Sequence, residues 1–349
     1  MSPFVFSLHP TYILPLININ TPKKPTNFLS TLAKPHKMKV PYQLKQGQKR
    51  LSHQLPSGLN MEVIFQEAIV KHPRTKSPPL VFVHGSFHAA WCWAFHWLPF
   101  FSEFGFDCYA VSLLGQGQGE SDETSGPVAG TLQTHAMDVA NFIQKEIRSP
   151  PVLLGHSFGG LIVQSYISNM TNIHFTGRGN LHPQLAGAVL VCSVPPSGNS
   201  GLVWRYLFSK PIAAFKVTMS LAAKAFATSL SLCKETFFSK EMEDHLVQRY
   251  QELMKESSRR PLFDLKKLNE SLPVPSVPES SLNILVLGAS NDFIVDNEGL
   301  TETATFYGVP SVCVDGVAHD MMLDCSWEKG AQAILSWLND LNNLNNQDR

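Results

Sequence analysis

Short apolar runs alternate with amphipathic segments along most of the chain after about residue 60. Several runs are apolar on both faces, which is typical of strands that helices cover on both sides of a parallel sheet. The predicted strands are residues 61–70, 80–83, 108–112, 152–154, 186–192, 283–287 and 311–314. Apolar positions spaced three and four apart predict helices over residues 132–147, with Thr131 as N-cap, and 327–338. This alternation predicts an α/β fold with a mostly parallel, doubly wound sheet.

One long segment departs from the alternation. Between the strands at 186–192 and 283–287 lie about 90 residues with no strand pattern, including a long helical pattern over 211–232. Long insertions in compact domains are usually functional, so we expect a helical lid at residues 197–279. The alternative is an ordinary packed pair of helices. The predicted core is then residues 56–196 and 280–345.

The first 61 residues carry eight Lys or Arg and no acidic residue, and prolines interrupt them repeatedly. This composition predicts a disordered leader over residues 1–55 that acts as a transit peptide, and hence a chloroplast protein. The alternative is a cytoplasmic protein with a disordered extension and a working start at Met38.

The remaining 288 residues hold 20 basic and 28 acidic residues, so we expect no nucleic-acid partner. Six cysteines without a CxxC pair predict reduced, buried thiols and no zinc site or disulfide framework. No proline-free apolar stretch reaches about 18 residues, so we expect no membrane span. The sequence leaves the oligomeric state open.

The segment VLLGHSFGG combines an apolar strand with a glycine-flanked serine, and an amphipathic helical pattern follows it. In this context Gly155, Ser157 and Gly159 predict a nucleophile elbow, a strained strand-to-helix turn that exposes a serine hydroxyl. The flanking glycines fit because a Cβ there would collide with neighbouring backbone. The following helix would direct its N-terminal N–H groups at a developing oxyanion.

A nucleophilic serine needs a base and a carboxylate that orients it. The strand at 283–287 is followed by GASNDFIVD, which offers Asp292 and, four residues later, Asp296. We prefer Asp292 because it lies in the turn just past the strand. The last strand is followed by His319, which is the only histidine after His245. The predicted catalytic triad is Ser157, Asp292 and His319.

The expected oxyanion hole takes its backbone N–H groups from Phe158 and from Ser86, in the loop HGSFHAAWCW. We expect His88, Trp91 and Trp93 to pack rather than react. Three further carboxylates in the last third of the chain read as solvated or capping groups: Asp315, Asp320 and Asp324.

These motifs, in this order, resemble the α/β-hydrolase superfamily over residues 55–345. HGSFHAAWCW is similar to the plant methylesterase and hydroxynitrile lyase branch and to lid-bearing lysophospholipase-like hydrolases. The combination of this segment with VAGTLQTHAMDVANFI is similar to plant plastid-type hydrolases of undefined substrate. Related epoxide hydrolases and haloalkane dehalogenases use an Asp nucleophile, where this chain has Ser157. Hydroxynitrile lyases have Lys directly after the histidine, where this chain has Asp320.

The sequence therefore predicts a serine hydrolase that cleaves a lipophilic carboxylic ester through an acyl-enzyme. This chemistry needs no metal or organic cofactor. The apolar lid suggests a lipophilic small-molecule or lipid ester as substrate, with peripheral lipid contact through the lid. The alternatives are an acyltransferase or lyase that uses the same triad, and a non-catalytic ligand receptor on a hydrolase scaffold.

Overall fold

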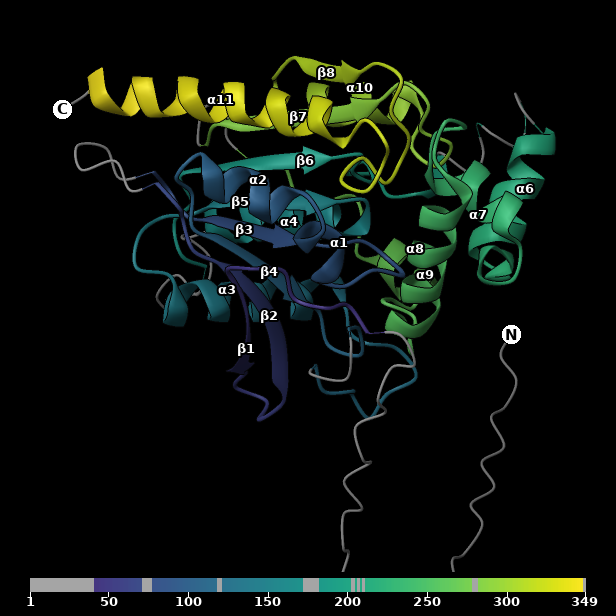
Figure 1. The fold of residues 1–349 in the computed structure, drawn as a ribbon, viewed down its shortest axis with the longest axis horizontal. Coiled ribbons are helices and arrows are strands. Elements are labelled where there is room, and N and C mark those ends of the chain that lie inside the picture. Colours follow the sequence, from purple (N-terminus) through teal and green to yellow (C-terminus); the bar gives the residue numbers. More distant parts are fainter. Residues whose placement is uncertain are drawn as a thin grey trace, which may run out of the picture. The chain divides into compact units, whose positions relative to one another are not determined.

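An eight-stranded sheet organises the chain in this computed structural model, in the order β1-β2-β4-β3-β5-β6-β7-β8 (Figure 1). The structure describes residues 41–70, 77–117, 121–171, 182–201, 205, 208, 211–277 and 282–347. The strands are β1 Gln48–Gln54, β2 Asn60–Gln66, β3 Leu80–Val83, β4 Cys108–Ser112, β5 Val152–His156, β6 Gly187–Val191, β7 Ile284–Ala289 and β8 Ser311–Val314. β2 pairs antiparallel with β1 and β4, and the other neighbours pair in parallel. The predicted doubly wound α/β sheet is confirmed.

The first strand corrects the predicted domain boundary, because the fold begins before residue 56. β1 pairs along its whole length with β2, and Tyr42 is buried against the domain. Most side chains of β1 are exposed or partly exposed, because it is an edge strand with one neighbour. In the sequence, the polar composition of β1 is therefore hard to distinguish from that of the predicted leader. Of the predicted leader, residues 1–40 lie outside the described residues.

Helices cover both faces of the sheet. One face packs against α1 Trp91–Ala94, α2 Trp97–Glu103 and α11 Trp327–Gln347. The other face packs against α3 Leu132–Glu146, α4 Phe158–Thr171 and α10 Asn297–Tyr307. Successive residues of β3 alternate between these two cores, as the two-residue period of a strand requires. Thr131 caps α3 as predicted, since its hydroxyl accepts from the Thr134 N–H.

The segment between β6 and β7 is helical in its described residues. It contains α6 Pro211–Leu221, the 3₁₀ turn η1 Ala225–Ala227, α7 Leu230–Phe237, α8 Asp244–Ser257 and α9 Leu265–Glu270. Figure 1 shows these helices gathered at the end of the sheet toward which β3 and β6 point. The single long helix predicted over 211–232 is wrong, because the chain breaks at Lys224, which has φ +52°. Ser229 then caps α7 by accepting from the Leu232 N–H.

Candidate active site

Ser157 occupies a strained turn between β5 and α4. Its φ is +54°, a left-handed conformation that costs a non-glycine residue roughly 1–3 kcal/mol. Its N–H donates to the Val191 carbonyl at 3.1 Å, and its carbonyl accepts from the N–H groups of Gly160 and Val194 at 3.0 and 3.2 Å. The neighbouring strand β6 and the start of α4 thus hold the serine in this turn.

The glycines around Ser157 are required by close approach of the backbone. A Cβ on Gly155 would lie 2.5 Å from the Gly159 carbonyl oxygen. A Cβ on Gly159 would lie 2.4 Å from the carbonyl oxygens of both Val83 and His84. The glycines of GHSFGG are therefore required for the first turn of α4 to pack against the end of β3.

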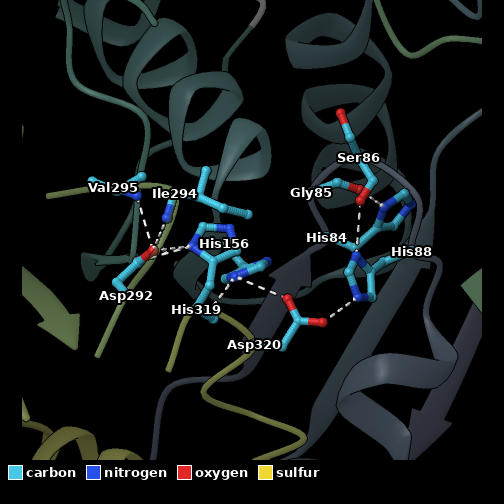
Figure 2. A network of polar contacts seen from close by, with 10 residues as sticks. All are labelled: His84, Gly85, Ser86, His88, His156, Asp292, Ile294, Val295, His319 and Asp320. Atoms are coloured by element: carbon cyan, nitrogen blue, oxygen red, sulfur yellow. Dashed lines mark hydrogen bonds and ion pairs between the residues drawn. The ribbon is translucent and has the colours of Figure 1, made fainter. Parts of the chain in front are cut away.

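Asp292 and His319 meet at the ends of β7 and β8 (Figure 2). His319 Nδ1 donates to the Asp292 carboxylate, 2.8 Å from Oδ2 and 3.0 Å from Oδ1. Oδ1 also accepts from the backbone N–H groups of Ile294 and Val295, at 2.7 and 2.8 Å. Because Nδ1 carries the proton, Nε2 of His319 is left as the basic nitrogen.

Burial and charge act in opposite directions on His319, which is 2% exposed. Burial lowers its pKa, but the charge and hydrogen bond of Asp292, together with the charge of Asp320, raise the pKa above its ordinary value. The imidazolium that forms when this histidine takes a proton is therefore stabilised by two carboxylates.

Asp296, the weaker candidate for the acid, has a different role. Its Oδ1 accepts from the Gly299 N–H at 2.9 Å and so caps α10. The same carboxylate forms a bidentate pair with Arg205, at 2.7 and 3.0 Å. No contact with His319 is found for it among the described residues.

The loop after β3 lies directly against the serine. A Cβ on Gly85 would lie only 2.8 Å from the Ser157 Cβ. His84 Nδ1 donates to the Gly85 carbonyl at 2.7 Å, and its Nε2 accepts from the Leu113 N–H at 3.0 Å. Burial lowers the pKa of His84 to about 3, so this neutral tautomer persists. The carbonyl and N–H of a trans peptide point in opposite directions, so His84 fixes the peptide that carries the Ser86 N–H. Phe158, the other expected donor, is the first residue of α4.

The structure thus brings Asp292 and His319 into contact and places Ser157 near them. The ring of His156, the residue before the serine, lies 4.7 Å from the His319 ring. In the described part of the chain, no hydrogen bond joins the Ser157 hydroxyl to His319.

Two residues of this region escaped the sequence prediction. Asp320 is 0% exposed, so its interpretation as a solvated or capping group is wrong. Its Oδ2 lies 2.8 Å from Nε2 of His88, which is also buried. Ala318, two residues before Asp320, and Met321, directly after it, are apolar and buried, and this is the local signal for an inward-facing acid. Asp324 is likewise buried, and its carboxylate accepts from the Ser239 N–H.

Two clusters each bring three potential metal-binding atoms within 4.8 Å of one another. One consists of His156, His319 and Asp320, and the other consists of Cys192, Asp292 and His319. Both clusters depend on His319, whose Nδ1 already binds Asp292. We therefore assign neither cluster to a metal. All six cysteines are free, but Cys313 and Cys325 are exposed, which corrects the expectation that every thiol is buried.

A cavity of about 440 Å³ lies beside the acid, between the ends of β6 and β7 and the start of α10. Cys192, Ser290, Asp292 and Leu300 help to line it, whereas Ser157 and His319 do not. Because the cavity does not reach the serine, we do not assign the substrate to it.

The insertion between β6 and β7 contacts the loops that carry the site. The ring of Phe87, next to Ser86, lies 4.8 Å from Phe226 of η1. The Asp320 N–H donates to the Phe237 carbonyl of α7 at 2.9 Å. Trp91 Nε1 donates to Ser257 Oγ of α8 at 2.7 Å. These contacts make η1, α7 and α8 part of the structure around the site.

A mostly parallel sheet with helices on both faces and a strained serine at a strand-to-helix turn defines the class of α/β hydrolases. The profile of the alpha/beta hydrolase family matches residues 80–333, so the chain belongs to this family. Human protein phosphatase methylesterase 1 is 29% identical over 120 residues, which are 34% of this chain and only 28% of that protein. The match thus spans less than a third of the methylesterase's length.

Solved structures resemble the fold over most of the chain. A lipase from Acinetobacter baumannii matches with a TM-score of 0.61 and 18% identity, covering 85% of this chain and 93% of that one. An esterase from Exiguobacterium antarcticum matches with a TM-score of 0.59 and 18% identity, covering 82% and 98%. An epoxide hydrolase also matches, so the fold leaves the reaction open. No helix among the described residues is both long and apolar enough to cross a bilayer.

Proposed function

We propose that this protein is a serine hydrolase that cleaves a lipophilic carboxylic ester. Ser157 Oγ attacks the ester carbonyl, and His319 Nε2 takes the serine proton and then passes it to the leaving alcohol. The backbone N–H groups of Ser86 and Phe158 stabilise the tetrahedral oxyanion. Water then hydrolyses the acyl-enzyme through the same base, and no cofactor takes part.

The observation that carries this proposal is the Asp292–His319 pair beside a serine held at positive φ. The carboxylate accepts two backbone N–H groups as well as His319, so it is fixed before any substrate arrives. The serine at the nucleophile position favours ester chemistry over the epoxide and haloalkane reactions that the resemblance associates with an Asp nucleophile.

A fluorophosphonate probe tests the nucleophile, and a chain-length series of soluble esters tests the reaction. We expect the probe to label the wild-type protein at Ser157. Ser157→Ala is expected to abolish labelling and to reduce kcat on the order of 10⁴-fold or more. Near-full turnover by Ser157→Ala would exclude this nucleophile. A folded wild-type protein that does not react with the probe would favour the receptor alternative. Acyl products formed with competing alcohols or amines would identify an acyltransferase.

We further propose that the insertion acts as a lid that contacts lipid. Ile212, Phe215 and Met219 of α6 are 76%, 66% and 41% exposed, and their spacing of three and four residues puts them on one face of this helix. An apolar stripe of this kind suits the acyl chain of a substrate or the lipid surface that supplies it.

The chloroplast location is also part of the proposal and rests on the basic, acid-free composition of the first 61 residues. A fusion of residues 1–60 to a fluorescent protein tests it in plant cells. Import into plastids would support the transit peptide, and a cytoplasmic signal would support the alternative.

A further inference from the structure

A buried chain of polar groups joins the oxyanion loop to the loop that carries His319 (Figure 2). His88 Nδ1 donates to the Ser86 carbonyl at 2.8 Å, and His88 Nε2 lies 2.8 Å from Asp320 Oδ2. His88 is 1% exposed and Asp320 is 0% exposed. His88 and Asp320 lie 232 positions apart in the sequence, so only the fold brings them together.

The partners of His88 fix where its protons lie. The Ser86 carbonyl can only accept, so Nδ1 of His88 carries a proton. The contact between Nε2 and the Asp320 carboxyl requires a second proton, which is shared by the two groups. Loss of either partner would therefore leave the other buried without its hydrogen bond.

Together His84 and His88 hold two successive peptides around Ser86. His84 binds the Gly85 carbonyl and His88 binds the Ser86 carbonyl. Phe87 follows at φ +70°, a strained conformation for a side chain of this size. Such a conformation persists only where the surroundings impose it, and the His88 contact is part of those surroundings.

At its other end, the chain of polar groups reaches His319. One ligand atom each of His156, His319 and Asp320 lie within 4.8 Å of one another. His156 Nε2 donates to the His319 carbonyl at 3.0 Å and lies 3.8 Å from Asp320 Oδ1. Burial, followed by the charges of His319 and His88, keeps the pKa of His156 well below its ordinary value, so this donor is a neutral imidazole. The titratable groups around His319 are thus Asp292, Asp320, His156 and Cys192.

This inference rests on the ester hydrolysis proposed above. We propose that His88 and Asp320 are positioning residues, which fix the Ser86 peptide relative to His319 and place a second negative charge beside the imidazolium that forms in the reaction. One buried pair then fixes the peptide directly after the oxyanion donor and also lies beside the base, so the two loops are linked. A change to either residue would affect both.

The test compares Asp320→Asn with Asp324→Asn, a change at the other fully buried acid of the same loop. Asn keeps the shape of Asp320 and removes its charge. We expect an NMR titration to show a lower His319 pKa in Asp320→Asn than in the wild-type protein, because an attracting charge is lost. Asp324→Asn should leave this titration unchanged, because its carboxylate faces Ser239. This measurement needs no turnover, so it is independent of the proposed activity.

The kinetic arm tests positioning of the oxyanion loop. His88→Gln cannot reach both Ser86 and Asp320, and we expect roughly a 10- to 100-fold loss of kcat with KM changed less than about threefold. Asp320→Asn should lose kcat similarly, and the double variant should lose little more than the more affected single variant, since one unit is removed. Thermal unfolding of each variant verifies its fold. If Asp320→Asn does not fold, the kinetic test rests on His88→Gln alone.

Two results would overturn the inference. One is a His319 titration in Asp320→Asn that matches that of Asp324→Asn, and the other is strictly additive losses of kcat in the double variant. If the wild-type protein hydrolyses no ester, the proposed function fails, and the titration still decides whether Asp320 acts on His319.

Discussion

Replacing Asp292 with Asn tests whether this carboxylate orients His319 and sets the position of its proton. In the wild-type protein Oδ1 accepts from the N–H groups of Ile294 and Val295, and both carboxylate oxygens face His319 Nδ1. The Asn oxygen would stay on the two backbone donors, because an amide NH₂ there would leave both unpaired. The NH₂ group would then face His319 and force its Nδ1 to accept. The proton of the neutral imidazole would then lie on Nε2, so Nε2 could no longer accept the proton of Ser157.

A wrong tautomer of this kind lowers kcat by about 10⁴, or roughly 5.5 kcal/mol of transition-state stabilisation. We therefore expect Asp292→Asn to lose about four orders of magnitude in kcat, measured by steady-state hydrolysis of a soluble ester, and to label slowly with fluorophosphonate. The fold should persist, since both backbone contacts remain.

Asp296→Asn is the matched control in the same turn. It keeps the acceptor for the Gly299 N–H and weakens the pair with Arg205, which is partly exposed. We expect a loss of at most about 1 kcal/mol of stability and little change in kcat. If Asp292→Asn retained kcat within about tenfold of wild type while Asp296→Asn lost it, the acid would be wrongly assigned.

The remaining predictions concern stability and the insertion. Burial lowers the pKa of His84 to about 3 and the pKa of His135 to about 4. Below the ordinary histidine pKa, these two side chains therefore bind protons in the unfolded protein but stay neutral in the folded protein. Stability should therefore fall below about pH 6.5, by roughly 2 kcal/mol per histidine at pH 5, whereas equal urea midpoints at pH 7.5 and pH 5 would contradict this. Gly159→Ala should prevent folding or cost more than about 3 kcal/mol, because its Cβ meets two carbonyl oxygens that cannot move; near-wild-type stability in thermal unfolding would count against the turn. Phe215→Asp should weaken sedimentation with phospholipid vesicles, whereas Leu51→Asp, on the exposed edge strand, should not; equal effects would argue against lipid contact through α6.

Much of the fold follows from local pattern. All seven predicted strands are present, although the one predicted over 61–70 ends at Gln66. The central strands β3, β5 and β6 were the easiest to predict, because a strand buried on both faces is a short apolar run whatever its neighbours are. The strained turn at Ser157 is also local, since its glycines and the clashes they avoid lie mainly within one strand, one turn and one helix. The loops that follow β7 and β8 could be located by their order alone.

The errors came from features that depend on distant partners. β1 carries the polar side chains of an edge strand, and only its pairing with β2 distinguishes it from the leader. The break at Lys224 interrupts a run that is apolar on both sides. The sequence alone suggests that Asp320 is solvated, because acidic residues usually are, and its partner His88 lies 232 positions earlier in the chain. A buried pair of this kind has no period or spacing from which it could be predicted.

The insertion divides into two parts with different attachments to the site. α7 and the loop after it bind the His319 loop, through Phe237 and the Asp320 N–H and through Ser239 and Asp324. α6, by contrast, contacts α7 through Ser220 and Thr236 and presents large apolar side chains to solvent. Displacing α7 would break its hydrogen bond to Asp320, next to His319, whereas displacing α6 would not. We therefore expect substitutions on the exposed face of α6 to change which esters are accepted while the His319 titration stays fixed, so that recognition and base positioning can vary independently within one insertion.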